Sequence, residues 1–458
     1  MSTLHSKAAR RFVADAEKTS WHDATFWSVR QKRDTMAQEL PEWETLREQA
    51  SAIKRHTITH LADYLEMFSH QLEKRGVVVH WAENAEEFNN EVLEILNSHG
   101  VKKMVKSKSM LTEECEMNPF LEANGIDVVE TDLGERIIQL LKQRPSHIVM
   151  PAIHLKREEV GRMFEDKGIS QQKGNYDPTY LTKCARKHLR NQFMEAGAGM
   201  TGCNFGVAQT GDIVVCTNEG NADMSTSVPK LHIVAMGIEK LIPDYASLAV
   251  FQRLLCRCGT GQPTTSFTSH FRQARPGGEM HVILVDNGRS DIIADEQHWE
   301  TLKCIRCGAC MNTCPVYRRS GGYSYTYFIP GPIGINLGML HDPYRNSDNV
   351  SACTLCLSCD KVCPAEVAPG SQVYLWRQSL DKLGKANPMK KMMSLGMSVI
   401  FEHPCVYSVA TRIAPLANIL PNRLTYVRGI NPWGVGHTLP IFAKETFQQL
   451  WKKNKGKF

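Results

Sequence analysis

Two stretches of the chain, CIRCGACMNTCP at residues 304–315 and CTLCLSCDKVCP at residues 353–364, carry the same cysteine pattern. In each, three cysteines stand at two-residue spacing, and a fourth follows three residues later, directly before a proline. This is the bacterial ferredoxin motif, in which three thiolates hold one 4Fe-4S cube and the fourth reaches the other cube when two are present. We therefore predict one cluster on Cys304, Cys307, Cys310 and Cys363, and a second on Cys353, Cys356, Cys359 and Cys314.

Two alternatives to an electron-transfer pair remain open at this point. Zinc also binds C-x2-C pairs, but it takes four tetrahedral ligands and does not require this repeated spacing with prolines. The clusters could also act only as structural staples of the fold. When each motif supplies its fourth cysteine to the other motif's cluster, the two clusters are held close together. This proximity favours electron transfer.

The connection between the motifs, residues 315–352, is rich in glycine and proline and too long for a simple hairpin. It resembles the helical ferredoxin domains of membrane-chain dehydrogenases more than the small β-hairpin ferredoxins. We expect a mostly α-helical two-cluster domain at residues 296–380.

The chain before this domain alternates short β-branched runs with helical stretches. Strands are expected at residues 77–81, 103–105, 126–130, 148–153, 205–217, 231–236 and 280–286, and helices at residues 85–97, 111–124, 133–142, 177–196 and 245–255. Such alternation indicates an α/β domain with a parallel, doubly wound sheet, here at residues 76–295. Residues 1–75 have helical periodicity, and residues 381–458 form a Met-rich tail that we expect to be helical.

Composition excludes several classes of protein. The chain has 458 residues, ordinary globular composition and a net charge of +6, too small an excess to predict nucleic-acid binding. Its 15 cysteines follow no secretory signal, so they predict metal binding and not disulfides. The best membrane candidate, residues 395–401, is far shorter than the about 18 apolar residues that a span needs. We expect a cytoplasmic protein and leave open a peripheral contact at the inner face of the cytoplasmic membrane.

Seven cysteines lie outside the two motifs. Cys115, Cys184 and Cys405 stand alone and are expected to pack as small apolar side chains. The role of the other four stays undecided, because their spacing fits no metal motif: Cys203, Cys216, Cys256 and Cys258.

One loop of the α/β domain is a candidate ligand site. Residues 199–221, GMTGCNFGVAQTGDIVVCTNEGN, combine glycine turns with a β-hairpin that ends in Asn218-Glu219-Gly220-Asn221. Such a strand end can present the Glu219 carboxylate to a ligand. It can equally be a tight turn that uses Asn and Gly for positive φ. No flavin or nicotinamide fingerprint is evident in the chain.

The order of these parts resembles a known family. Five segments carry the resemblance beside the ferredoxin motifs: PAIH at 151–154, TGCNF at 201–205, QTGD at 209–212, TNEGN at 217–221 and TSHF at 268–271. The chain is similar to the lactate-utilisation iron-sulfur protein B family. The resemblance implies a lactate-utilisation (LUD) domain, related in fold to the sugar-phosphate isomerase and CoA-transferase superfamily, joined to a two-cluster domain.

The same resemblance implies a function and partners. The expected complex contains two further proteins, one rich in cysteine and one smaller with its own LUD domain. It oxidises L-lactate to pyruvate without NAD and passes the electrons to the respiratory chain. Catalytic residues are unknown. If lactate binds on this chain, an arginine would suit its carboxylate and a base its 2-hydroxyl group, which makes weak candidates of Glu219, His154, Arg186 and His188.

Two other functions remain open. The α/β domain could be a self-sufficient transferase or isomerase whose clusters sense redox state. Alternatively, the chain could be a docking scaffold for a different 2-hydroxy-acid dehydrogenase, with the flexible thioethers of Met389 to Leu420 as the contact surface. The alternative for that segment is an ordinary core helix.

Overall fold

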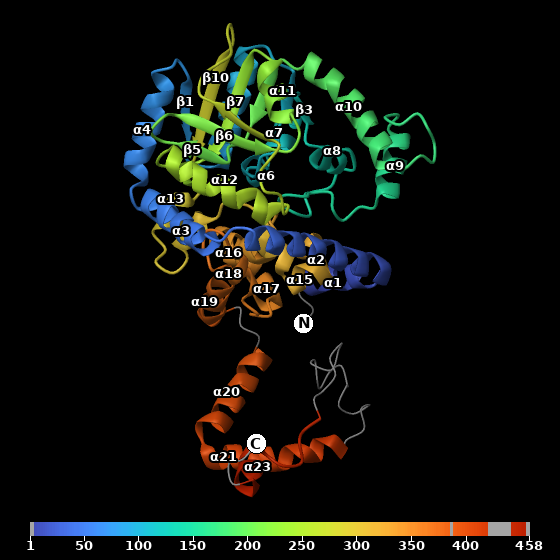
Figure 1. The fold of residues 1–458 in the computed structure, drawn as a ribbon, viewed down its shortest axis with the longest axis vertical. Helices are drawn as coiled ribbons and strands as arrows, with labels where there is room; N and C mark the ends of the chain where they lie inside the picture. Colours follow the sequence, from blue (N-terminus) through green and yellow to red (C-terminus); the bar gives the residue numbers. More distant parts are fainter. Residues whose placement is uncertain (1–3, 385–387, 420–440, 455–458) are drawn as a thin grey trace. The chain divides into compact units, whose positions relative to one another are not determined.

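The computed structural model describes residues 4–384, 388–419 and 441–454, and the chain divides into two compact units, Met1–Ser379 and Leu380–Phe458 (Figure 1). The first unit contains both the α/β domain and the cysteine motifs. Each unit is described by itself.

A six-stranded, wholly parallel sheet forms the centre of the α/β domain. Its strands, in spatial order, are β1 (Val78–Ala82), β10 (Glu279–Val285), β7 (Leu231–Gly237), β4 (Ala198–Thr201), β2 (Lys103–Lys106) and β3 (Asp127–Glu130). All seven residues of β7 are buried, as in a parallel sheet covered on both faces. The predicted α/β domain with a parallel sheet is confirmed.

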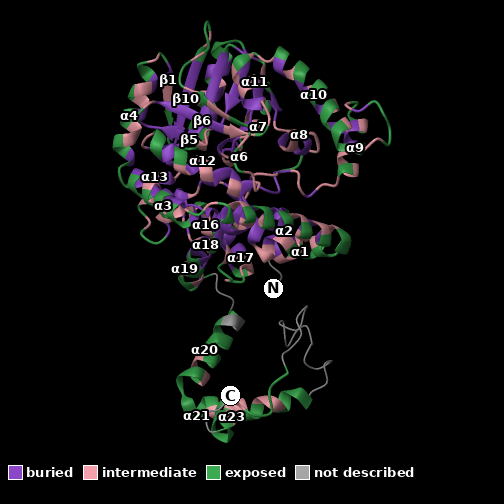
Figure 2. Cartoon of the chain, viewed as in Figure 1, coloured by how far each residue is buried: buried purple, intermediate pink, exposed green. Residues whose placement is uncertain are grey.

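The two faces of this sheet pack against different elements. Helices α5 (Ala85–Ser98), α6 (Met110–Glu114) and α7 (Met117–Ala123) share one core with the first face. The second face packs against α4 (Leu61–Glu73), α10 (Pro178–Glu195), α11 (Asn221–Ser227) and a smaller sheet. Figure 2 shows the buried strands enclosed by helices whose outer faces are exposed.

The smaller sheet has the order β8 (Leu241–Ile242), β5 (Phe205–Val207), β6 (Asp212–Thr217) and β9 (Phe267–Phe271). Strands β5 and β6 form the expected antiparallel hairpin, and Gly211, with φ of 69°, lies in its turn. After β6 the chain turns at residues 218–220 and enters α11, a short helix that the sequence did not predict. This turn carries Glu219 to the end of the strand.

The strand expected at residues 148–153 is absent from the structure, which has turns there. The apolar run is folded back because Ser146 donates hydrogen bonds through its backbone N–H and its hydroxyl to the Pro151 carbonyl, at 3.1 and 2.8 Å. This loop packs on the cysteine-rich region, where the Tyr317 hydroxyl donates to the Ser146 carbonyl at 2.6 Å. The remaining helices of this part are α8 (Leu133–Leu140), α9 (Arg157–Asp166), α12 (Tyr245–Gly259), α13 (Arg289–Ile293) and the 3-10 turn η1 (Ile238–Lys240).

The region with the cysteine motifs is helical, as expected. It consists of η2 (Trp299–Lys303), α14 (Ala309–Thr313), α15 (Pro315–Ser320), η3 (Gly322–Ser324), α16 (Gly331–His341), α17 (Pro343–Ala352), α18 (Ser358–Val362) and α19 (Pro369–Lys382). The fourth cysteine of the first motif, Cys314, caps α15, and Pro315 occupies the first helical position, where its missing N–H costs nothing.

The N-terminal helices α1 (Leu4–Val13), α2 (Ala16–Gln38) and α3 (Trp43–Thr59) contact the cysteine-rich region (Figure 1). Arg47 on α3 donates to the Cys363 carbonyl at 2.9 Å, and Arg33 on α2 donates to the Val362 carbonyl at 3.2 Å. Residues from the start of the chain therefore support the second cysteine motif. The domain boundaries at 75/76, 295/296 and 380/381 stay a prediction.

The second unit contains α20 (Pro388–Glu402), α21 (Pro404–Ile413), η4 (Ala414–Ile419) and α23 (Phe447–Lys453). The segment proposed as a docking surface is helical through Ile419, and its last residue, Leu420, lies outside the described residues. Apolar side chains along α20, such as Leu395 and Phe401, are exposed. No described helix combines the length and the apolar composition needed to cross a bilayer.

Candidate functional site

The four thiols assigned to the first cluster line one internal cavity. Cys304, Cys307 and Cys310 come from the first motif and Cys363 from the end of the second, and Pro364 and Ile333 complete the wall. Burial and then the nearby Cys304 thiol raise the pKa of Cys363 to about 12. Cysteines from both motifs therefore line this one cavity, and the crossed assignment of cluster ligands stays a prediction.

The fourth thiol of the first motif lies with the second motif. Burial, with contributions from Cys353 and Cys356, raises the pKa of Cys314 to about 11. The pKa of Cys359 is raised by burial, by Asp360 and by Cys310 and Cys314. Four neighbouring thiolates would repel one another, and all of these thiols except the exposed Cys356 are buried or partly buried, so a cationic metal centre is needed to hold them deprotonated.

The spacing of the sulfurs suits a cluster better than a single ion. Four thiolates around one tetrahedral zinc, each at about 2.3 Å, stand only about 4 Å apart. Within the described part of the chain, no three cysteine sulfurs lie within 4.8 Å of one another. No group of three described cysteine sulfurs is therefore as close together as the ligands of one zinc ion would be.

The backbone of both motifs is shaped in the same way. Arg306 and Leu355, the third residues of the two motifs, have φ of 59° and 55°, and the fifth residues Gly308 and Leu357 have 79° and 57°. Non-glycine residues seldom adopt this conformation, and it occurs here at corresponding positions of a repeat. It turns peptide N–H groups toward sulfur: Arg306 N lies 3.4 Å from Cys304 Sγ, and Leu355 N lies 3.3 Å from Cys353 Sγ.

A second cavity, of about 390 Å³, lies where the large sheet meets the cysteine-rich region. The carboxyl ends of parallel strands form one side of it, which is the usual ligand position in open α/β sheets. Residues that follow the strands include Lys108 after β2, Asp132 after β3, Gly202 after β4 and Glu239 after β7. Arg306 and Cys307 bring the first cysteine motif into its wall.

Two carboxyl groups face one another in this cavity. Asp132 caps α8, accepting hydrogen bonds from the N–H groups of Gly134 at 2.9 Å and Glu135 at 3.2 Å. Glu219 hydrogen-bonds to Asp132, and burial together with that neighbouring carboxylate raises the pKa of Glu219 to about 8. Glu219 therefore holds a proton at neutral pH, and Asp132 accepts it in a hydrogen bond.

Cationic side chains stand around the same cavity. Lys108 donates to the Val149 carbonyl at 2.9 Å and lies 3.6 Å from Glu135 Oε1. Arg306 is partly buried, and its buried Nη1 has no hydrogen-bond partner among the described residues. Arg289, by contrast, is held by Glu114 at 3.0 Å and by Glu239. An anionic ligand would therefore find a free guanidinium nitrogen on Arg306.

Comparisons with known proteins agree with these two sites. The LUD domain family matches residues 65–292, and the 4Fe-4S dicluster domain family matches residues 300–367. "Lactate utilization protein B" of Bacillus cytotoxicus is 40% identical over 92% of this chain and 90% of the relative. The chain belongs to the lactate utilization protein B family. It is thus an iron-sulfur protein of lactate utilisation, as the sequence resemblance implied.

Other relatives span the chain equally well. "Lactate utilization protein B" of Anoxybacillus flavithermus is 38% identical over 99% of this chain and 96% of the relative. The "Uncharacterized electron transport protein YkgF" of Escherichia coli is 36% identical over 92% of this chain and 91% of the relative. A crystal structure of a DUF162 family protein from Deinococcus radiodurans covers 49% of this chain and 98% of its own chain, with 13% identity and a TM-score of 0.28.

Of the four residues that the sequence offered for lactate binding, Glu219 lines the cavity of this family member and the other three do not. His154 is enclosed by Ser146, Gln143 and Tyr323 at 2.8 to 3.1 Å, which satisfies both ring nitrogens. Arg186 is exposed on α10, and His188 accepts a hydrogen bond from Arg136 at 3.0 Å. A lactate-binding role for these three stays a prediction without a shared cavity to support it.

The four undecided cysteines gather at the same place. Cys203, Cys216 and Cys256 line the cavity, and burial raises the pKa of both Cys203 and Cys216 to about 12, so neither is a thiolate at neutral pH. Cys258 on α12 is buried and hydrogen-bonds to Cys307 of the first motif. The sequence could not indicate this contact, because the two cysteines lie 49 positions apart in the chain.

Proposed function

We propose that this protein binds two 4Fe-4S clusters and serves as the electron-transfer component of an L-lactate dehydrogenase complex. The observation that carries the proposal is the cavity in which Cys363 joins Cys304, Cys307 and Cys310. Thiols contributed by both motifs keep the two centres close to one another. When bound, the clusters supply one-electron oxidation and reduction.

The chain's own residues set the properties of these centres. The eight motif cysteines supply the ligands: Cys304, Cys307, Cys310 and Cys363 for the first, and Cys353, Cys356, Cys359 and Cys314 for the second. Peptide N–H groups directed at sulfur, such as those of Arg306 and Leu355, disperse the negative charge of the thiolates. The Arg306 side chain and the contact of Cys258 with Cys307 add further positive charge and hydrogen bonding at the first centre.

The second part of the proposal concerns the substrate. Lactate, or a 2-hydroxy acid of similar size, occupies the cavity beside Cys307, with its carboxylate held by Arg306 and Lys108. The ionised form of Glu219 accepts the proton of the 2-hydroxyl group, and a pKa of about 8 makes this form accessible just above neutral pH. Conversion to pyruvate releases two electrons and two protons, so a two-electron carrier of the flavin class must intervene before the one-electron centres.

That carrier comes from a partner in this proposal. Relatives are named as protein B of lactate utilisation, which implies further proteins in the same system. We assign the two-electron carrier to one of two partner proteins. One is rich in cysteine, and the other is smaller and has its own LUD domain. The complex works in the cytoplasm or at the inner face of the membrane.

Copurification tests this assignment most directly. An affinity-tagged chain expressed at its native level should retain both partner proteins and iron after anaerobic purification. A chain that purifies alone, contains iron and transfers acyl groups between carboxylates and coenzyme A thioesters would instead support the transferase function.

A further inference from the structure

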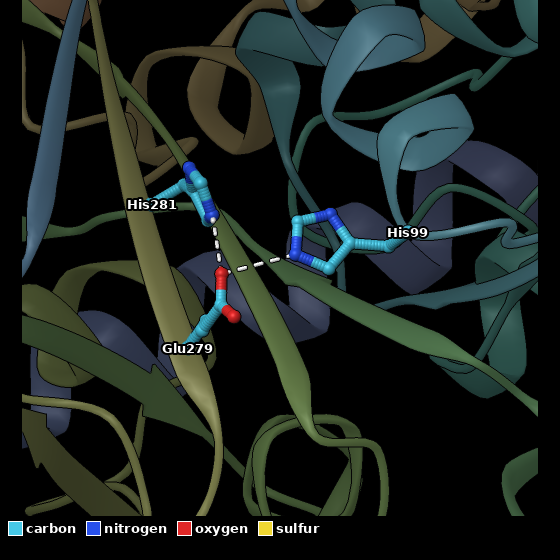
Figure 3. A group of neighbouring side chains, drawn as sticks. All are labelled: His99, Glu279 and His281. Carbon is cyan, nitrogen blue, oxygen red and sulfur yellow. Dashed lines mark hydrogen bonds and ion pairs between the residues drawn. The ribbon is translucent and has the colours of Figure 1, made fainter.

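A group of three side chains lies at the amino-terminal edge of the large sheet, at the opposite ends of the strands from the cavity (Figure 3). Glu279 and His281 project from the same side of β10, and His99 follows α5. Glu279 Oε2 lies 3.0 Å from His99 Nε2 and 3.7 Å from His281 Nε2. The three ligand atoms all lie within 4.8 Å of one another.

The hydrogen bonds on the far side of each imidazole decide which nitrogen carries the proton. His99 Nδ1 lies 2.7 Å from the Ile95 carbonyl, which can only accept, so Nδ1 is the donor. On the neighbouring ring, His281 Nδ1 lies 2.9 Å from His80 Nε2. His80 Nδ1 in turn lies 2.6 Å from Glu91 Oε1.

Both of these contacts are hydrogen bonds when His80 Nδ1 donates to Glu91 and His281 Nδ1 donates to His80 Nε2. The Nε2 atom of His281 is then left with a lone pair. That atom is buried and has no hydrogen-bond partner among the described residues, and His281 as a whole is only 7% exposed. His281 Nε2, His99 Nε2 and a Glu279 carboxylate oxygen thus face one small volume, which a divalent cation or a proton on His99 can fill.

We propose that His99, Glu279 and His281 bind a divalent metal ion of the zinc type. Two imidazole nitrogens and one carboxylate oxygen are ligands that Zn²⁺ accepts, whereas Mg²⁺ and Ca²⁺ prefer oxygen alone. Three protein ligands leave a fourth position for water. His80 and Glu91 orient the His281 ring, as outer carboxylate and histidine partners do at zinc sites.

The site is independent of the iron-sulfur centres and of lactate. It joins the start of β10 to the end of α5, two segments that are far apart in the sequence. The competing occupant is a proton on His99, which would pair with Glu279 directly. The test must therefore separate a metal from a proton and must allow for zinc that enters the cysteine sites.

The experiment uses the full chain with its clusters assembled under anaerobic conditions. Wild type and variants are dialysed against buffered Zn²⁺, and zinc and iron are counted by mass spectrometry. Wild type should retain about one more zinc ion per chain than Glu279→Gln or His281→Gln, at equal iron content. His56→Gln is the matched control, because His56 packs against His60 with ring centroids 4.4 Å apart and forms an exposed imidazole pair without a carboxylate.

Two further measurements make the result specific. His80→Gln should weaken zinc binding about 10- to 100-fold without removing a ligand. X-ray absorption at the zinc edge should show nitrogen and oxygen at about 2.0 to 2.2 Å and no sulfur. Equal zinc content in wild type and in both ligand variants, or an equal loss in His56→Gln, would overturn the proposal and leave a protonated His99 as the occupant. Glu279 is exposed, so its variant decides the matter if His281→Gln misfolds.

Discussion

The structure places the Glu219 side chain beside a second carboxyl group, which the sequence around Glu219 did not indicate. The turn explains its backbone, but the side chain faces Asp132 inside the cavity and shares a proton with it. Glu219→Gln keeps the shape and hydrogen bonding while removing proton exchange. We expect the reconstituted complex to lose about 100-fold in lactate turnover, with unchanged cluster absorbance.

The control for this variant is Glu122→Gln, an exposed glutamate at the end of α7. Turnover near wild type in both variants would reduce Glu219 to a turn residue. Loss of iron in Glu219→Gln would instead point to a structural effect on the neighbouring motif.

The raised pKa of Glu219 also predicts how stability depends on pH. In the unfolded chain this carboxyl ionises near 4.5, whereas in the folded protein it stays protonated up to about 8. Between these values the folded state holds more protons, so the free energy of unfolding falls as pH rises, by at most about 1.4 kcal/mol per pH unit from this group. Glu219→Gln lacks this contribution. Urea unfolding at pH 6 and pH 8 should show a larger loss of stability in wild type than in the variant, and parallel losses would refute the shift.

At the residue scale, the sequence predicts what is local. The cluster ligands could be proposed from the sequence because three of each four lie within one heptapeptide. Asp132, Arg306 and Cys258 were missed because their functional neighbours are distant in the chain: Glu219, the cavity and Cys307. Composition gave no signal for the group formed by His99, Glu279 and His281, which depends on strand pairing.

At the scale of structural elements, the two cysteine motifs can be tested for whether the fourth cysteine of each motif binds the cluster of the other motif. Cys363 follows α18 and is the last cysteine of the second motif, but it lines the cavity of Cys304, Cys307 and Cys310. Cys363→Ala should therefore impair the first cluster and preserve the second. Electron paramagnetic resonance of the reduced protein should lose one of two signals, and Cys304→Ala should lose the same one. If Cys363→Ala matches Cys353→Ala instead, each motif holds its own cluster.

Helix α12 places the thiol of Cys258 beside the proposed first cluster, although Cys258 is not one of the cluster's ligands. The buried Cys258 thiol contacts Cys307, and an S–H donor to a cluster thiolate favours the reduced, more negative state. Cys258→Ala should shift the potential of this cluster to more negative values by about 40 mV, if the bond contributes about 1 kcal/mol to the reduced state. Redox titration with Cys256→Ala as control measures this. An unchanged potential, or loss of the cluster, would contradict a tuning role.

Most strands of the large sheet were predicted from periodicity because each is a short apolar run between turn signals, but β4 near its centre was not, and neither were β8, β9 and α9. The strand predicted at residues 148–153 was wrong, because an apolar segment can be buried equally well as a loop. Its hydrogen bonds from Ser146 to Pro151 and its contact with Tyr317 are tertiary features. Element periodicity also could not show that α2 and α3 pack on the second cysteine motif.

At the scale of the whole molecule, the ligand cavity and the cavity lined by Cys304, Cys307, Cys310 and Cys363 share Ile148 and Cys307. The loop before α14 and the carboxyl ends of the strands therefore place the candidate ligand cavity beside the first cysteine motif within one compact unit.

The same arrangement limits what the chain can do alone. Lactate gives up two electrons together, and each 4Fe-4S cluster accepts one. Without a carrier of the flavin class, the purified chain with its clusters, about eight iron and eight sulfide per chain, should reduce a dye with L-lactate at only a small fraction of the rate of the complex. Addition of the two partner proteins should restore the rate, while dithionite should reduce the clusters of the single chain directly and show that they are competent. Rapid lactate-dependent dye reduction by the single chain would place the complete reaction on this protein, and zinc in place of iron would remove the electron-transfer function altogether.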